Sequence, residues 1–117
     1  MYNIIQWGVL PLDIQIKKGL LDVCVLAVVN NQDSYGYQII KDISTCIEIS
    51  ESTLYPILKR LEAGHCLSTY SMEHNGRLRK YYRVTALGRQ KIYDFFNEWK
   101  EMEQIHDFIL QEGCQTL

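Results

Sequence analysis

The 117-residue sequence predicts a mainly α (α+β) fold, a winged helix-turn-helix extended by a long C-terminal helix. Three observations lead to this fold class. Apolar residues recur at helical spacing in three successive segments, two short alternating runs then flank an Asn-Gly turn, and a heptad-patterned segment ends the chain. We expect one domain's worth of chain: an apolar arm at 1–16, a winged-helix unit at 17–84, a final helix at 85–110 and a frayed tail at 111–117.

The first segments of the chain are strongly apolar. Alternation from Leu10 to Ile16 indicates a short strand or an extended arm that packs against other residues. Apolar residues then cover most of the circumference of a helix expected over Gly19–Val29, so this helix should be central. A second helix, apolar along one face, is expected over Tyr35–Ser44, with Asp33 or Ser34 as its cap.

A third helix is predicted from Ser50 to Gly64. Its apolar residues begin at Leu54 and recur at i, i+3, i+4 and i+7, which places them on one face. Ser50 or Ser52 can cap the start, and Gly64 suits the C′ position just beyond the end. Pro56 should lie in about the first turn, because a missing N–H costs least there.

A β-hairpin and the longest helix complete the winged-helix pattern. Alternating runs at Leu67–Glu73 and Lys80–Val84 flank the turn signal His74–Gly76. From Thr85 to Leu110 the apolar residues are spaced three and four apart, as in helices that pair in coiled coils. This heptad stripe consists of Ile92, Phe95, Trp99, Met102, His106 and Ile109, and Phe96 widens it.

Composition limits the class of protein and its compartment. A hydrophobic content of 47% with 22% charged residues is typical of a globular chain. No apolar run approaches the roughly 20 residues of a membrane helix, and the start lacks a basic signal-peptide region, so we expect a cytoplasmic protein without membrane contact. The cysteines are scattered, which predicts reduced thiols and no metal site: Cys24, Cys46, Cys66 and Cys114.

The formal net charge is only −2, but the charges are unevenly distributed. The stretch from Lys59 to Lys91 holds eight basic and two acidic residues, whereas residues 1–58 carry −3 and residues 92–117 carry −5. Nucleic acid requires a local positive patch rather than a basic chain. The charge pattern therefore predicts DNA contact in the middle of the sequence, with the acidic last helix pointing away from the duplex.

Two features within or beside this basic stretch suit double-stranded DNA. With the leucines of the third helix facing the core, its N-terminal half should present hydroxyls, an aromatic ring and a cation to the major groove. The turn of the hairpin should lay cations against phosphates or into the minor groove. The expected DNA-binding residues are Ser52, Thr53, Tyr55 and Lys59 in the groove, Arg77, Arg79 and Lys80 in the wing, and Lys17, Lys18 and Tyr37 near phosphates.

Several motifs occur in a specific order: Tyr35–Ile39, Ser52–Pro56, Lys59–Gly64, Arg79–Tyr82 and Thr85–Gly88. Over about Gly19 to Trp99 the chain thereby resembles the PadR family of bacterial transcription regulators, in its compact subgroup with a single C-terminal helix. The resemblance implies a homodimeric winged-helix repressor of palindromic operators, with the last helix and the first forming the dimer interface. The expected interface residues of the last helix are Ile92, Phe95, Phe96, Trp99, Met102, His106 and Ile109. Two departures bear on operator sequence rather than on DNA binding: Ser52 stands where many members have Gly, and Arg77-Leu78 where Gly-Pro is common.

The same resemblance raises the question of a ligand. Some compact members bind flat aromatic drugs at the dimer centre beside a tryptophan, and Trp99 matches that position. Val23, Met102 and Glu103 would line such a pocket, whose acid suits a cationic aromatic molecule. The alternative is that Trp99 is simply a core residue of the dimer. For His106 in the same stripe, the alternatives are a satisfied interface residue and a pH-sensitive one.

Other function classes find little support in the sequence. A Gly-rich phosphate loop, a Ser-His-Asp order in motif context and metal-ligand spacing are all missing, so we expect neither an enzyme nor a cofactor. The competing interpretation is a protein-interaction module that kept the winged helix but lost DNA binding. The basic stretch argues against it.

Overall fold

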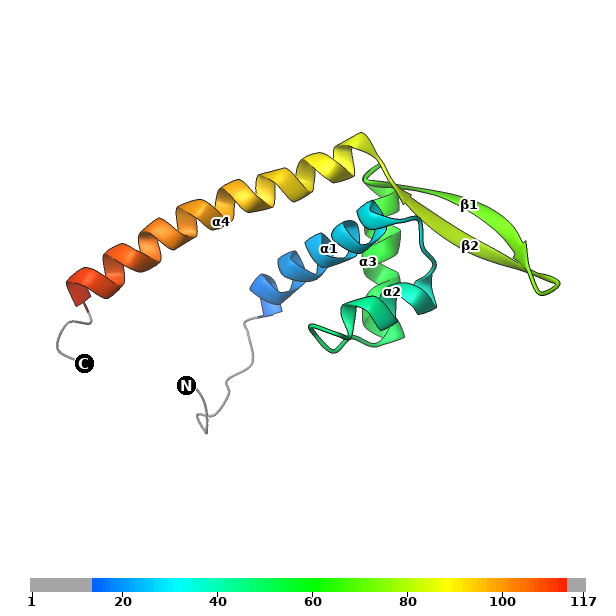
Figure 1. Cartoon of the computed structure of the whole chain (residues 1–117), viewed down its shortest axis with the longest axis horizontal. Coiled ribbons are helices and arrows are strands. Elements are labelled where there is room, and N and C mark those ends of the chain that lie inside the picture. Colours follow the sequence, from blue (N-terminus) through cyan, green and yellow to red (C-terminus); the bar gives the residue numbers. More distant parts are fainter. Residues whose placement is uncertain (1–13, 114–117) are drawn as a thin grey trace.

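The computed structural model describes residues 14–113, with side chains from Gly19 onward. The predicted fold class is confirmed: three short helices, a two-stranded wing and a long last helix follow in order. In Figure 1 the first three helices gather in the middle, the wing projects to one side and the last helix to the other. The elements are α1 (Ile14–Asn31), α2 (Gly36–Ile43), α3 (Glu51–Ala63), β1 (Leu67–His74), β2 (Arg77–Val84) and α4 (Ala86–Gly113).

Helix α1 is central, as its apolar circumference predicts, and it contacts α2, α3, β2 and α4. It begins at Ile14, so the expectation of a strand or extended arm up to Ile16 is wrong for residues 14–16. Alternation over a few apolar residues does not separate strand from helix, and extending a formed helix is far easier than starting a new element. The rest of the predicted arm lies outside the described residues.

One apolar core joins the helices to the base of the wing. It includes the four apolar residues that were predicted to share one face of α3, and all four are at most 4% exposed. The core residues are Leu21, Val25, Leu26, Val29, Ile39, Ile43, Ile49, Leu54, Ile57, Leu58, Leu61, Cys66, Leu67, Tyr82 and Val84. No helix within residues 14–113 is long and apolar enough to cross a membrane.

The cap predicted for α2 is wrong. Tyr35 occupies the N-cap position, with extended backbone and no capping side chain. Ser34 instead pairs with Tyr82 of β2: the Ser34 N–H donates to the Tyr82 carbonyl at 3.2 Å, and the Tyr82 N–H donates to the Ser34 carbonyl at 2.7 Å. Asp33 binds side chains of the wing. Both candidate caps are therefore used to attach the hairpin to the helical body.

Helix α3 starts as predicted but holds its proline deeper than predicted. Ser50 is the N-cap, and its hydroxyl lies 3.0 Å from that of Ser52 and 3.1 Å from that of Thr53. Pro56 is the sixth helical residue, in the second turn rather than the first. Because proline has no N–H, the Ser52 carbonyl four residues back lacks its usual helical partner. Ser52 and Pro56 both lie on the exposed side of the helix.

The end of α3 is shifted by one residue from the prediction. Gly64 is the C-cap with φ of −85°, and His65, not Gly64, takes the left-handed C′ conformation with φ of 63°. The Cys66 N–H donates to the Leu61 carbonyl at 2.9 Å and the His65 N–H to the Glu62 carbonyl at 3.0 Å. These two bonds form a Schellman motif around a residue that is not glycine.

The wing is a regular antiparallel hairpin, longer than the predicted runs. Leu67 pairs with Val84 at its base and His74 with Arg77 at its tip. The two linking residues, Asn75 and Gly76, have φ of 51° and 79°. Two consecutive positive φ values define a type I′ turn, whose twist matches that of the strands. The wing therefore stays regular to its last pair.

Helix α4 starts from a tight junction with the wing. The Gly88 N–H donates to the Thr85 hydroxyl at 3.1 Å, and that hydroxyl donates to the His65 carbonyl at 2.7 Å. A Cβ at Gly88 would lie 2.4 Å from the Cys66 carbonyl oxygen, so only glycine fits there. The helix continues to Gly113; residues 111–113, expected to be frayed, are helical, because each added residue simply extends the existing hydrogen-bond ladder.

The left-handed backbone at His65 gives a stability prediction. Replacing His65 with Gly removes the steric strain of a Cβ at positive φ and should raise the free energy of unfolding by about 1 kcal/mol. Urea denaturation measures it. The matched control is Gly64→Ala, at negative φ, which should change stability by less than about 0.5 kcal/mol. A loss of stability in His65→Gly would contradict the assigned cap.

Candidate nucleic-acid interface

The outer face of α3 carries the residues that the sequence assigned to the major groove. Ser52, Thr53, Tyr55 and Lys59 are all exposed, while the apolar residues between them are buried. The linked hydroxyls of Ser50, Ser52 and Thr53 lie at the N-terminal end, where free backbone N–H groups and the helix dipole favour anions. This end of α3 therefore combines hydrogen-bonding groups with a positive potential.

Tyr55 is positioned by a close approach to α2. A Cβ at Gly36 would lie 2.7 Å from the Tyr55 hydroxyl oxygen and 3.1 Å from the ring, so the ring rests where a side chain would otherwise stand. The ring remains 47% exposed. The motif around Gly36 thus has a physical reason: glycine lets the aromatic side chain of α3 lie across the start of α2.

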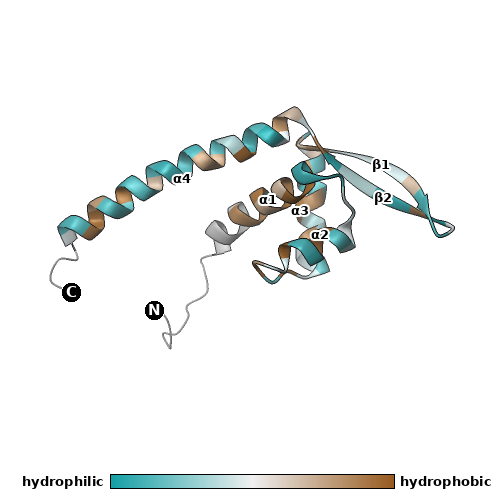
Figure 2. Cartoon of the chain, viewed as in Figure 1, coloured by the Kyte–Doolittle hydropathy of each residue, from teal (hydrophilic) through white to brown (hydrophobic). Residues whose placement is uncertain are grey.

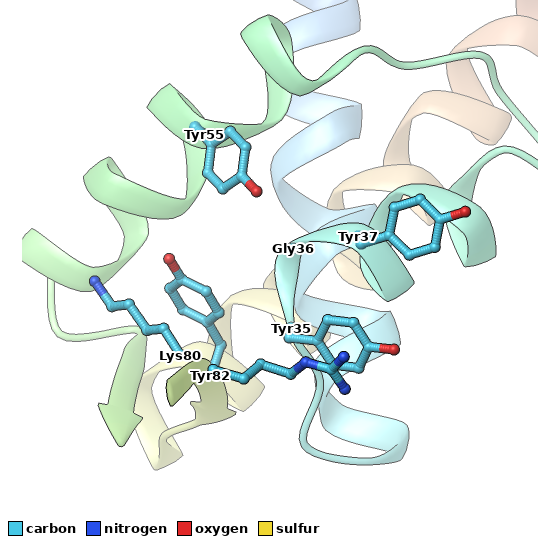
Figure 3. A pocket seen from close by; sticks show the side chains of 7 residues that line it. Tyr35, Gly36, Tyr37, Tyr55, Lys80 and Tyr82 are labelled. Atoms are coloured by element: carbon cyan, nitrogen blue, oxygen red, sulfur yellow. The ribbon is translucent and has the colours of Figure 1, made fainter. Parts of the chain in front are cut away.

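A pocket of about 350 Å³ opens between α2, α3 and β2. In Figure 3 the hydroxyls of Tyr55 and Tyr82 point into the same space, whereas the ring of Tyr37 points away from it. Tyr37 is 61% exposed, and the Lys41 ammonium lies 5.7 Å from its ring centre. The lining residues are Tyr35, Gly36, Tyr37, Tyr55, Arg79, Lys80 and Tyr82.

Three tyrosines and two arginines form a continuous stack between the helical body and the wing. The Arg79 guanidinium lies 3.9 Å from the ring centre of Tyr35, whose edge meets Tyr81 at 5.5 Å. Tyr81 stacks on Tyr70 at 5.5 Å, and the Arg83 guanidinium lies 4.9 Å from the Tyr70 ring. We call Tyr35, Tyr70 and Tyr81 the tyrosine column. It orients two wing cations by contacts with ring faces.

Asp33 fastens the outer end of the tyrosine column. Its Oδ2 accepts hydrogen bonds from the Tyr70 hydroxyl at 2.8 Å and from the Arg83 Nε at 3.1 Å. The hydrogen bond to Asp33 is the main reason that the pKa of Tyr70 is raised above its ordinary value, with desolvation adding to it. Asp33 therefore neutralises Arg83 and links the α1–α2 turn to both strands of the wing.

The predicted wing cations differ in whether they are paired with other side chains. Lys80 donates to Glu62 of α3 at 3.3 Å, and Thr69 donates to the other carboxylate oxygen at 3.2 Å. Burial alone would lower the pKa of Lys80, but the negative character of Tyr82 and Glu62 outweighs burial and raises it. Arg77 is exposed and makes no ion pair or ring contact with the described residues. Lys17 and Lys18 lie in α1, and their side chains are outside the description.

Sequence reasoning missed several residues of this surface, Tyr70 and Tyr81 of the tyrosine column among them. Gly36 and Tyr82 shape the pocket, and Asp33 and Arg83 fasten the wing. The alternation of β2 was the available signal for Tyr82, because it lies on the same strand face as Lys80. Nothing local in the sequence pairs Asp33 with Arg83, fifty residues away.

A second surface lies between α1 and α4. Three of the four residues predicted for a ligand pocket, Val23, Trp99 and Met102, line a groove of about 500 Å³. The fourth, Glu103, is not among the lining residues and accepts a hydrogen bond from the Trp99 Nε1 at 2.6 Å. The other lining side chains are apolar, apart from Lys91 and three acids: Asp22, Asp94 and Glu98. The groove thus combines apolar side chains with three carboxylates, of which that of Asp22 is paired with Arg60 of α3.

Hydrophobic residues recur along α4 (Figure 2), and many of their side chains are exposed. Of the predicted dimer residues, Ile92 packs against the chain's own core and Phe95 is half-buried. His106 is exposed, with Nδ1 3.3 Å from Asp107. The exposed fractions of the others are 58% for Phe96, 45% for Trp99, 54% for Met102 and 54% for Ile109. Among residues 14–113, no three potential ligands gather to hold a metal ion.

Comparison with known proteins identifies the family. The model of the transcriptional regulator PadR-like family matches residues 25–94, more than half of the chain. The chain belongs to this family. The motif resemblance is therefore confirmed, and with it the assignment to transcriptional regulators rather than enzymes.

Solved structures have the same fold. A protein of Streptococcus mutans UA159 is 43% identical with a TM-score of 0.71, over 81% of this chain and 90% of its own. A PadR-like transcription factor from Bacteroides fragilis is 31% identical with a TM-score of 0.74, over 81% of this chain and 94% of its own. Bacillus subtilis PadR in complex with operator DNA, at 21% identity and a TM-score of 0.62, matches 66% of this chain and 46% of its own.

The role of Asp33 gives the second prediction. In Asp33→Asn the charge that holds Arg83 and raises the pKa of Tyr70 is lost, so the Tyr70 pKa should fall towards the ordinary tyrosine value. Amides of β1 and β2 should exchange hydrogen faster, while those of α1 should not. Ultraviolet titration and hydrogen-exchange mass spectrometry measure these effects. Asp42→Asn, on α2, is the control; unchanged exchange in the wing of Asp33→Asn would refute the fastening role.

Proposed function

We propose that the chain is a homodimeric, sequence-specific DNA-binding repressor that acts on palindromic operators in the cytoplasm. The observation that carries the proposal is the arrangement of one surface. The exposed N-terminal face of α3 and the arginine-bearing edge of the wing border the same pocket through Tyr55, Arg79 and Lys80. That Bacillus subtilis PadR has been solved with operator DNA supports the use of this fold on a duplex.

In the proposed complex α3 enters the major groove. Its width of roughly 12 Å admits one helix, and the short hydroxyls of Ser52 and Thr53 can approach base edges or phosphates. Tyr55, held over Gly36, and Lys59, one turn further along, extend the contact. Tyr37, Lys17 and Lys18 complete the proposed set at backbone phosphates.

The wing lies beside the helix and binds the backbone or the minor groove. Arg77 is exposed, and Arg79 is stacked on Tyr35 through its face, which leaves the N–H edge of the guanidinium for a phosphate. Lys80 shares its charge with Glu62, so it contributes less than either arginine. The two arginines therefore account for most of the wing's electrostatic attraction.

The second subunit covers the apolar side chains of α4. Helices with a heptad stripe pair through it, and Phe96, Trp99, Met102 and Ile109 are about half exposed in the single chain. Two copies related by a two-fold axis would present two α3 helices, which fits an operator of two inverted half-sites. The acidic C-terminal part of α4 would then lie at the dimer centre.

The α1–α4 groove is a candidate site for a ligand that relieves repression. Trp99 offers a large aromatic face, and the carboxylates of Asp94 and Glu98 line the same groove among apolar side chains. A flat, cationic aromatic molecule matches both properties. Such a ligand would alter DNA affinity only if it binds the DNA-competent and the DNA-free arrangements of the dimer unequally.

The third prediction concerns salt. Affinity for a duplex spanning the promoter of the protein's own gene should fall steeply from 50 to 200 mM salt, because each neutralised phosphate releases condensed counterions. Arg79→Ala should weaken binding to all duplexes and reduce the logarithmic salt slope by about one. Fluorescence anisotropy measures both.

Lys100→Ala is the matched control, since Lys100 is an exposed cation on the acidic part of α4. Its salt slope should equal that of the wild type. Salt-independent or undetectable binding by the wild type would reject the DNA-binding function in favour of a protein-interaction module.

The fourth prediction concerns Trp99. In a Trp7→Phe background, where Trp99 is the sole tryptophan, a planar aromatic cation such as ethidium should quench its fluorescence at micromolar concentration. In the otherwise wild-type chain, Trp99→Ala should raise the dimer dissociation constant measured by sedimentation. Tyr93→Ala, a second exposed aromatic on α4, is the control. If the dimer is unchanged and quenching is absent, Trp99 has neither role.

A further inference from the structure

The tip of the wing carries an unusual apolar side chain. Leu78 is 80% exposed, more than any other large hydrophobic side chain among the described residues. Its neighbours along β2 are Arg77 and Arg79, and its cross-strand partner is Glu73. Single exposed apolar residues are common on proteins, so exposure alone does not indicate a binding role for Leu78. Leu78 is distinguished by its place at the tip of a projecting hairpin between two arginines.

The register of the hairpin fixes the face of the ribbon on which the Leu78 side chain lies. Residues of one strand alternate between faces, so Leu78 shares a face with Lys80 and Tyr82. At the base of the wing that face is turned towards the body, because Tyr82 is in the core and Lys80 reaches Glu62 of α3. Leu78 therefore lies near the end of the wing, on the ribbon face that contacts α3 at the base.

The two arginines that flank Leu78 lie on the opposite face of the ribbon, whereas Lys80 shares the face of Leu78. Arg77 and Arg79 alternate with Leu78, and Arg79 is held by Tyr35 of the tyrosine column. A narrow hairpin tip thus has one apolar side chain with a guanidinium before and after it. Minor-groove proteins use this combination: cations bind the phosphate walls while an apolar side chain enters between base pairs and opens a step.

We propose that Leu78 is a wedge residue that inserts into the minor groove of duplex DNA, bends it and selects deformable base steps. This inference rests on the proposed DNA-binding function and adds a specificity-determining residue to it. Charge complementarity favours DNA over a protein partner, because Arg77 and Arg79 flank the apolar group and outweigh the single carboxylate of its cross-strand partner Glu73. The strands pair regularly up to His74 and Arg77, which gives the backbone at Leu78 a defined position.

If Leu78 inserts, the affinity should depend on which base step lies at the insertion point, although no hydrogen bond to a base edge is made there. Pyrimidine–purine steps such as TA and CA unstack most easily, whereas A-tract steps resist. A duplex with a TA step under the wing should therefore bind more tightly than the same duplex with AA. The preference should disappear when the wedge is shortened.

The test compares wild type, Leu78→Ala, Arg77→Ala and Met72→Ala on one probe. A 30-base-pair duplex, chosen by footprinting within the promoter of the protein's own gene, carries fluorophores at both ends to report bending. Leu78→Ala should lose about tenfold in affinity, bend the duplex less and lose the TA preference, with an unchanged salt slope. Arg77→Ala should instead lower the salt slope.

Met72→Ala is the matched control, because Met72 is 52% exposed on the same hairpin but on the face opposite to Leu78. It should bind and bend like the wild type. Leu78→Ala should unfold at the wild-type temperature, since almost nothing packs on that side chain. Unchanged affinity, bending and step preference in Leu78→Ala overturn the wedge, while loss of salt-dependent binding by the wild type overturns the proposed function and the wedge together.

Discussion

The attachment of the wing to the helical body depends on Tyr82. Its backbone pairs with Ser34 in both directions, and its side chain is only 6% exposed, in the core beneath the pocket. One residue of β2 therefore belongs at once to the hairpin, the core and the candidate interface. An isolated two-stranded hairpin is at best marginally stable in water, so the wing needs this anchorage to keep its direction.

Anchorage and charge neutralisation act through the same contacts. Asp33 binds Arg83, Glu62 binds Lys80, and Tyr35 holds Arg79 through its ring without neutralising it. Of the basic side chains of β2, the two nearest the tip thus keep their full charge, while the other two are paired with acids of the helical body. Exposed ion pairs add little to stability, but they remove cations from non-specific attraction to phosphates. The pattern concentrates positive charge at the end of the wing.

The sequence predicted the element order and the inward face of α3, because both depend on local periodicity and on turn residues such as Asn75 and Gly76. It failed where two local signals compete. Gly64 beside His65 suggested the left-handed position, yet the hydrogen bonds of the Schellman motif put it on His65. Ser34 was predicted as a cap of α2, but its backbone pairs with that of Tyr82, which is distant in the sequence.

Predictions for the candidate site divide in the same way. Exposure of Ser52, Tyr55 and Lys59 follows from the helical period of α3, so sequence alone placed them correctly on its outer surface. The partners of Arg79, Lys80 and Arg83 come from elements far away in the chain, and no pattern within β2 reveals them. Long-range pairing, which depends on tertiary packing, is the part that required the structure.

The direction of α4 relative to the wing links the proposed dimer to the proposed DNA surface. Two half-sites on one face of a duplex are about 34 Å apart, so a dimer must hold its two α3 helices at a defined separation. Here the root of α4 is locked: Thr85 bonds the His65 carbonyl directly after α3, and Gly88 lies against the Cys66 backbone with no room for a Cβ. Rotation of α4 at this junction would break contacts with the end of α3 and the start of β1 together. Any change in how two α4 helices pack would therefore move the α3 helices as well, and the α1–α4 groove is where a bound molecule would impose such a change.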